Sequence, residues 1–301
     1  MKINPIFLSI LMISFTGFSQ KPYIVGLVPV RNEAPIVKQC LQALSLYVDA
    51  IVVLDDASDD NTVAIIESIS NQYKVKKIIK KTIWYRDEAG DRNLLLKVGR
   101  EIGGTHFIVI DADEMFTANC AYNNLLRNRI LSLHPGDRLG MNHIQLWGNI
   151  RQYRFFDEKL KFFIFCDDGV SCYGNRFIHE MRSPLNLRGG ANLEIRDGRF
   201  GLLHFAFANW RNALIKQVWY QCLEKIRDAS KSVQDIQMMY KWYKQQNISL
   251  YEVLPYWFNY SFFDAHVFDH AEHWRYKQIQ KWIAQYGRNY FDQLDIDWHI
   301  Q

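Results

Sequence analysis

Two aspartates one residue apart, Asp111 and Asp113, directly follow the apolar segment 106–110 of sequence His-Phe-Ile-Val-Ile. A run this apolar is typical of a β-strand that is buried on both faces. A carboxylate at the end of such a strand is costly unless it is paired or binds a metal ion. The Asp-Ala-Asp sequence therefore predicts a site for a divalent cation on a diphosphate, with Asp113 as the more direct ligand. A solvated turn after a strand is the alternative.

Two other polar clusters follow apolar segments in the same way. Arg31-Asn32-Glu33 follows segment 23–30, and Asp55-Asp56 follows segment 50–54. If these segments are parallel strands joined by right-handed crossovers, their carboxyl ends lie on one edge of the sheet. Ligands bind at that edge in open α/β sheets. We therefore expect all three clusters to share one cleft.

The apolar periodicity between the clusters predicts the elements that position them. Strand and helix patterns alternate with short connections up to residue 116, which indicates an α/β fold with a mostly parallel central sheet and helices on both faces. The predicted strands are segments 23–30, 50–54, 75–79, 106–110, 139–147, 160–165, 177–180 and 202–205. Helices are predicted from Pro35 to Leu44, from Val63 to Ile69, around Leu94 to Ile102, from Ala121 to Ile130, from Trp210 onward and around Ile279 to Ile283.

The order and spacing of the motifs resemble glycosyltransferase family 2, which has the GT-A fold. The motifs are Pro29 to Glu33, Asp55 to Thr62, Arg92-Asn93 and Asp111 to Glu114, and the resemblance covers residues 23–116. It implies a hexosyltransferase that uses a nucleotide-sugar donor, with a UDP-sugar favoured. Many relatives have Tyr in place of Arg31.

A sugar nucleotide presents a base, a diphosphate and an anomeric carbon. Asp55 or Asp56 can accept a hydrogen bond from a base N–H, and the family pattern favours Asp56. Arg31 and Arg92 can pair with phosphate or stack on a base, although a surface salt bridge is the default for Arg31. The predicted nucleotide-sugar-binding residues are Pro29, Arg31, Asn32, Glu33, Asp56, Arg92 and Asp111.

The predicted cofactor is Mn²⁺ or Mg²⁺, held by Asp113. A divalent ion offsets the charge that develops on the departing nucleoside diphosphate. His204 is predicted as a further ligand, since imidazole suits Mn²⁺ better than Mg²⁺. A histidine in an apolar strand is also a common core residue, and the family pattern favours the ligand role.

The second half of the chain resembles the lipopolysaccharide-core β-glycosyltransferase branch, in which a His-Glu pair and a later His follow the DxD motif. His179-Glu180 and His204 carry this resemblance. It implies inverting transfer to a glycan or lipid-linked acceptor. Inversion needs a carboxylate that accepts the proton of the attacking hydroxyl, and Glu180 is predicted as this base. Asp167 and Asp168 are the alternatives.

Composition sets the broad class. The 301 residues carry a net charge of +4, which gives no case for nucleic acid as a partner and only a mild bias toward anionic substrates. Five cysteines without CxxC spacing suggest reduced, buried thiols. The predicted organisation is a GT-A domain over residues 23–208 and a helical C-terminal extension over residues 209–301.

The N-terminal residues 1–22 contain an apolar run from Pro5 to Phe18. Its length suits a signal peptide or a short uncleaved anchor. We expect a cytoplasmic enzyme that this segment can attach to a membrane; entry into the secretory pathway after cleavage is the alternative.

Other protein classes with similar patterns fit less well. A haloacid-dehalogenase phosphatase needs Thr or Val two residues after its second Asp, where this chain has Met115. A nucleotidyltransferase would have a glycine-rich loop at Pro29 to Asn32. The non-enzyme alternative is a carbohydrate-binding or scaffold protein on a glycosyltransferase fold.

Overall fold

The computed structural model describes residues 21–155, 160–228, 230–240, 248–268, 274–294 and 296. The predicted signal peptide or anchor therefore lies almost wholly outside the described residues. Within the described ranges, no helix combines the length and the apolar character that crossing a membrane requires.

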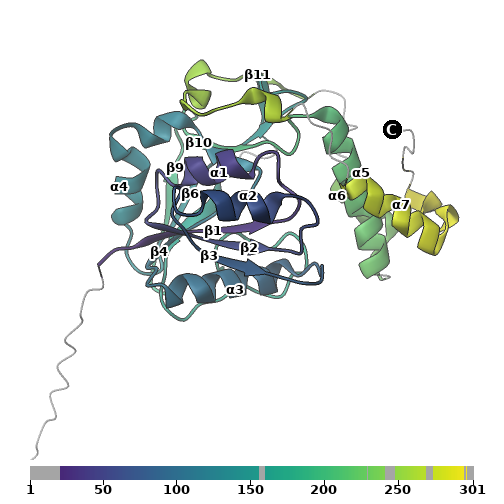
Figure 1. The fold of residues 1–301 in the computed structure, drawn as a ribbon, viewed down its shortest axis with the longest axis horizontal. Coiled ribbons are helices and arrows are strands. Elements are labelled where there is room, and N and C mark those ends of the chain that lie inside the picture. The colour runs from purple at the N-terminus through teal and green to yellow at the C-terminus, as the bar shows by residue number, and fades with distance from the viewer. Residues whose placement is uncertain are drawn as a thin grey trace, which may run out of the picture.

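Four parallel strands form the first half of the sheet, in the order β3-β2-β1-β4 (Figure 1). They are β1 (Ile24–Val30), β2 (Ala50–Asp55), β3 (Val75–Lys80) and β4 (His106–Val109). The residues of β1, β2 and β4 are almost all buried, as their unbroken apolar sequences require. Their shared direction places the loops after β1, β2 and β4 on one edge of the sheet.

The later strands extend this sheet with mixed directions. They are β5 (Glu114–Phe116), β6 (Arg138–Leu146), β7 (Gln152–Arg154), β8 (Lys161–Cys166), β9 (Asn192–Ile195), β10 (Gly201–His204) and β11 (Tyr251–Glu252). β8 lies antiparallel between β4 and β6. β10 lies between β6 and β5, with His204 in register with Gln145 on one side and Glu114 on the other. This register places His204 beside the DxD motif.

Helices cover both faces of the parallel strands (Figure 1). On one face lie α1 (Val37–Leu44) and α2 (Thr62–Ile69), whose apolar side chains share a core with β1. On the other lies α3 (Glu88–Glu101), which packs against β1 and β2 through Leu95 and Leu96. After β5 the chain forms the 3₁₀ segment η1 (Ala118–Asn124) and then α4 (Leu125–Leu131).

Several of the C-terminal helices pack around an apolar core of their own. The C-terminal segments are α5 (Trp210–Arg227), α6 (Val233–Tyr240), η3 (Pro255–Phe258), η4 (Ala265–Phe268), α7 (Trp274–Tyr286) and η5 (Arg288–Leu294). Trp219 and Cys222 of α5 pack with Ile279 and Trp282 of α7. The segment around η3 packs separately, with Trp257 against the apolar side chains of β6 and β10.

The predicted α/β class with a mostly parallel central sheet is confirmed. Four local predictions were wrong. Segment 177–180 forms no strand, α1 begins at Val37 instead of Pro35, the helix predicted from Ala121 begins as a 3₁₀ segment, and Cys172 is exposed. The extension also contains β11. The boundary between residues 208 and 209 stays a prediction.

Candidate active site

The three polar clusters meet at a cavity of about 90 Å³ at the carboxyl edge of the parallel strands, which we call the rim cavity. Among the predicted residues, its walls contain Pro29, Arg31, Glu33, Asp56, Arg92, Asp111 and Asp113. The prediction that the clusters share one cleft is therefore confirmed. A larger cavity of about 450 Å³, the outer cavity, shares the Asp113 and Arg31 walls and includes Asn32.

Asn32 holds the loops after β1 and β2 together. Its backbone adopts a left-handed conformation with φ 53°, which asparagine tolerates better than most residues. Its side-chain amide donates to Asp59 at 2.8 Å and accepts from the Asp59 N–H at 2.9 Å. The Asn32 N–H donates to Ser58 Oγ at 2.9 Å. These bonds fix the wall of the outer cavity.

The two neighbouring aspartates after β2 have different surroundings. Asp55 accepts hydrogen bonds from the Ser58 N–H and so closes its own turn. Asp56 lines the rim cavity and forms an ion pair with Lys81 at 2.6 Å. Lys81 also contacts Asp91 at 3.0 Å. Asp55 does not line the rim cavity. The base-binding role of Asp56 stays a prediction, and sequence reasoning missed Lys81.

The Arg31 guanidinium lies between two indole rings. Its carbon is 5.1 Å from the ring centroid of Trp84 and 5.2 Å from that of Trp274 on α7. It donates to the carbonyls of Asp56 and Ala57. Burial lowers the pKa of Arg31, although nearby aspartates oppose this shift. The default of a surface salt bridge for Arg31 was wrong, and Trp274, which lines both cavities, had no site role in the sequence analysis.

Asp111 lies between two guanidinium groups. Arg182 contacts one Asp111 oxygen at 2.6 Å, and Arg92 lies 3.7 Å from the other. Arg92 is buried, and its Nε and Nη1 atoms have no hydrogen-bond partner among the described residues. A buried cation with unused N–H groups at the wall of a cavity suits an anionic ligand. Sequence reasoning missed Arg182.

Asp113 forms an ion pair with Lys216 of α5. The Lys216 ammonium lies 3.1 Å from Asp113 Oδ2, and His204 Nε2 lies 3.4 Å from the same oxygen. Burial alone would raise the pKa of Asp113, but the Lys216 ammonium brings it well below its usual value. Asp113 is therefore a carboxylate at neutral pH. Lys216 was not predicted, because only the fold brings α5 over the rim.

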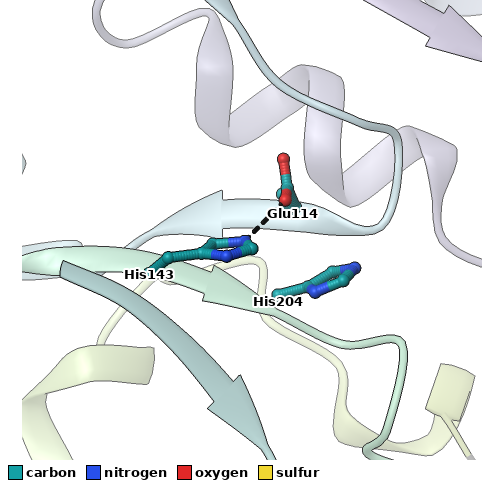
Figure 2. A group of neighbouring side chains, drawn as sticks. All are labelled: Glu114, His143 and His204. Carbon is teal, nitrogen blue, oxygen red and sulfur yellow. Dashed lines mark hydrogen bonds and ion pairs between the residues drawn. The ribbon is translucent and has the colours of Figure 1, made fainter. Parts of the chain in front are cut away.

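The predicted metal-ligand pair, Asp113 and His204, fits a divalent cation. The Asp113 carboxylate lines both cavities, and its Oδ2 lies 3.4 Å from the His204 imidazole nitrogen; the two atoms form a donor set suited to Mn²⁺. Glu114, His143 and His204 also form a compact group whose ligand atoms lie within 4.8 Å of one another (Figure 2). Glu114 and His143 are, however, hydrogen-bonded to each other at 2.8 Å. Asp113 with His204 is the more open pair.

The Glu114 carboxylate is fully buried and accepts hydrogen bonds from Arg182 as well as His143. Burial would raise the pKa of Glu114, but Arg182 and His143 bring it well below its usual value. Burial lowers the pKa of His143 to about 3, against the opposite effect of Glu114. The pair is a neutral imidazole that donates to a carboxylate.

Glu180, the predicted base, lines neither cavity. Its carboxylate accepts hydrogen bonds from the N–H groups of Arg176 at 3.2 Å and Met181 at 2.9 Å. Its own N–H donates to Glu88 at 2.9 Å. The preceding residue, His179, has φ 58°, which interrupts an extended chain and explains why no strand forms here. Its role as base stays a prediction.

The two alternative bases have partners within their loop. Asp167 forms an ion pair with Arg100 at 2.7 Å. Asp168 accepts hydrogen bonds from Val170, Ser171 and Arg188. Neither residue lines the rim cavity or the outer cavity.

Residues 27–127 match the sequence model of glycosyl transferase family 2. No curated protein sequence matches the chain. The matched region contains most of β1, all of β2 and the DxD motif, and it excludes His204 and Lys216.

Solved glycosyltransferase structures show weaker similarity. S. aureus TarS is 16% identical with a TM-score of 0.44, and the match covers 73% of this chain and 43% of TarS. TarS 1–349 in complex with UDP is 22% identical with a TM-score of 0.36, covering 42% of this chain and 37% of that one. The Pyrobaculum calidifontis mannosyltransferase PcManGT, in complex with GDP-Man and Mn²⁺, is 22% identical with a TM-score of 0.33, covering 42% and 36%.

The chain spans less than half the length of each of these solved structures. Through residues 27–127, which form the rim cavity's β1, β2 and DxD walls, the chain carries the sequence pattern of glycosyltransferase family 2.

Proposed function

We propose that the protein is a glycosyltransferase that moves a sugar from a nucleotide-sugar donor to a hydroxyl group of a glycan or lipid-linked acceptor, with inversion. The observation that carries the proposal is the meeting of Asp56, Arg92, Asp111 and Asp113 at one cavity, inside the region that matches family 2. A UDP-sugar is the favoured donor, and a role in lipopolysaccharide or other glycan biosynthesis follows from the branch resemblance.

The rim cavity supplies the groups that a nucleoside diphosphate requires. Asp56, in the wall of this cavity, would accept from the base, and Arg92 would offer its unused N–H groups to phosphate oxygens. Asp113 and His204 would hold Mn²⁺ or Mg²⁺, which supplies positive charge as the diphosphate leaves. Glu180 is the proposed base for the acceptor hydroxyl. The outer cavity, which adjoins the rim cavity at Asp113, is large enough for an acceptor sugar.

We propose that the protein is located in the cytoplasm and associates with a membrane through residues 1–22. Passage into the secretory pathway after cleavage of that segment is the alternative. Fractionation of cells that express the full chain, followed by N-terminal sequencing, separates the two.

The test is a screen of UDP- and GDP-sugars for release of nucleoside diphosphate, with and without Mn²⁺. Asp113→Asn should lower the rate by about 100-fold or more, because the charge opposite the leaving group is lost. Glu180→Gln should lower transfer by about 100-fold while UDP binding is unchanged. Asp197→Asn is the control, since Asp197 lines neither cavity.

Three results would change the proposal. Full transfer by Glu180→Gln would remove Glu180 as the base and leave the donor site intact. Full activity of Asp113→Asn would end the metal assignment. Calorimetric binding of UDP without turnover of any donor would favour the carbohydrate-binding or scaffold alternative.

A further inference from the structure

A continuous row of hydrogen bonds joins Glu114 to His204 across three strands. Glu114 Oε1 is 2.8 Å from His143 Nε2, and His143 Nδ1 is 2.9 Å from the Gln145 side-chain nitrogen. The Gln145 side-chain oxygen is 2.7 Å from His204 Nδ1. Gln145 is buried, with 1% of its surface exposed, so this amide has no water to replace either partner.

The direction of these bonds is fixed from the Glu114 end. An ionised carboxylate only accepts, and Glu114 already accepts from Arg182. With one proton on its ring, His143 must therefore donate from Nε2, which leaves Nδ1 as an acceptor. The Gln145 NH₂ group then donates to His143, and its carbonyl oxygen must accept the Nδ1 proton of His204. Reversing the amide would place two acceptors 2.8 Å apart between His143 and Glu114.

The same reasoning fixes the outer nitrogen of His204. In its singly protonated form, with that proton on Nδ1, His204 presents a lone pair at Nε2, 3.4 Å from Asp113 Oδ2. Two acceptors at that separation cannot share a hydrogen bond, but both can bind one cation. The rings of His143 and His204 are nearly parallel, with centroids 5.0 Å apart, and Figure 2 shows them side by side. This packing keeps His204 from turning its ring.

We infer that His143 and Gln145 are positioning residues for His204. Because Glu114 can only accept, the row of hydrogen bonds through His143 and Gln145 holds the His204 proton on Nδ1. His204 Nε2 is then free to bind a divalent cation together with Asp113. This inference rests on the proposed function for the identity of the cation. The hydrogen-bond direction is independent of it. Outer partners of metal-binding histidines commonly set the ring tautomer and its basicity in this way.

The first test reads the tautomer directly. In the ¹⁵N-labelled full-length protein, imidazole nitrogen shifts should show the His204 proton on Nδ1, with His204→Gln providing the assignment. In Gln145→Leu, His204 should become a mixture of tautomers. Gln145→Glu is buried at this position and so favours its neutral acid form, which can donate to His143 Nδ1 and accept the Nδ1 proton of His204; it should keep the wild-type tautomer. A wild-type proton on Nε2, or an unchanged tautomer in Gln145→Leu, would overturn the inference.

The second test reads binding of Mn²⁺ alone by the electron paramagnetic resonance signal of the free ion. Gln145→Leu should weaken Mn²⁺ binding about 10- to 100-fold, and Gln145→Glu should restore it. Gln221→Leu is the matched control, because Gln221 is also buried but bonds to the Gln217 carbonyl within α5. Equal affinity in Gln145→Leu and wild type would contradict the positioning role. Absence of Mn²⁺ binding by wild type would refute the metal assignment. The His204 tautomer would still test whether the row of hydrogen bonds from Glu114 runs in the inferred direction.

Discussion

At the scale of single residues, the site is a set of buried charges that neutralise one another. Asp113 keeps 14% of its side chain exposed and Lys216 keeps 13%, so their ion pair is largely hidden from water. The ammonium of Lys216 and a divalent cation need the same carboxylate oxygen. Lys216 is the counter-charge of Asp113 in this structure. If Asp113 binds the proposed cation through this oxygen, Lys216 would have to move away from it.

Replacing Lys216 with Met should separate these two cations experimentally. Without metal, we expect the free energy of unfolding to fall by about 3 kcal/mol, because a buried carboxylate loses its partner. Mn²⁺ should then raise the melting temperature of Lys216→Met more than that of wild type. Lys97→Met is the control, since Lys97 is an exposed lysine of α3 that lines neither cavity. An equal Mn²⁺ effect on wild type and Lys216→Met would show that the two cations do not compete.

Sequence reasoning found the residues that follow strands and missed those that reach the site from a distance. Asp56, Asp111 and Asp113 stand directly after apolar segments, so their meeting follows from strand direction. Lys216 and Arg182 have no such position, and only the packing of α5 and of the loop after β8 brings them to the carboxylates. The sequence contains no local signal for such partners.

At the scale of elements, β9 is held against β6 by a close approach of two glycines. A Cβ atom on Gly190 would lie 1.9 Å from the Gly136 carbonyl carbon, and Gly136 itself has φ +91°. Beside this contact, the Ala191 N–H donates to Asp137 at 2.8 Å and the Arg138 N–H donates to the Ala191 carbonyl at 2.9 Å. The glycine pair thus sets where β9 and β6 begin to pair.

Gly190→Ala should lower the free energy of unfolding by about 2–3 kcal/mol, because backbone must move to admit the methyl group. Gly198→Ala should change it by less than about 0.5 kcal/mol, since nothing lies within 4 Å of its added Cβ. Urea denaturation of both variants measures the difference. Equal stabilities would mean that the Gly136 turn moves without cost.

Strands were predicted correctly where the apolar pattern fits only one kind of secondary structure. Segment 106–110 has no alternative to a buried strand, and β4 forms there. Segment 177–180 has only two apolar residues, and His179 adopts a left-handed conformation with its ring nitrogen 2.6 Å from the Tyr240 hydroxyl. That contact comes from α6, so the local sequence could not indicate it.

At the scale of the whole molecule, the C-terminal helices complete the site that the parallel strands begin. The rim cavity is lined by Lys216 and Tyr220 of α5 and by Trp274 and Arg275 of α7. Every predicted site residue lies within residues 23–208, because the motifs are there. Trp274 of α7 both packs against the core of the C-terminal helices and lines the site.

We expect the free energy of unfolding to fall as the pH falls below about 6.5. The unfolded chain binds protons at its histidines in this range, whereas the buried histidines of the folded protein stay neutral. Burial lowers the pKa of His106, and it lowers that of His143 to about 3. A group with a lowered pKa binds its proton more weakly in the folded state, so protonation favours unfolding, by up to about 1.4 kcal/mol per pH unit for each group. The carboxylates Glu88, with a pKa of about 2, Asp113 and Glu114 add to this loss below about pH 4.5.

Urea denaturation between pH 7.5 and pH 4 should therefore show a falling free energy of unfolding. His106→Gln should flatten the slope between about pH 6.5 and pH 5, since it removes one buried group that the unfolded state protonates first. His106 has 4% of its surface exposed and hydrogen-bonds to Thr105, away from both cavities, so the catalytic groups are untouched. His134→Gln, at a side chain that is 88% exposed, should leave the slope as in wild type. If His106→Gln leaves the slope unchanged, the pKa of His106 is the same in the folded and unfolded protein, and the prediction is wrong.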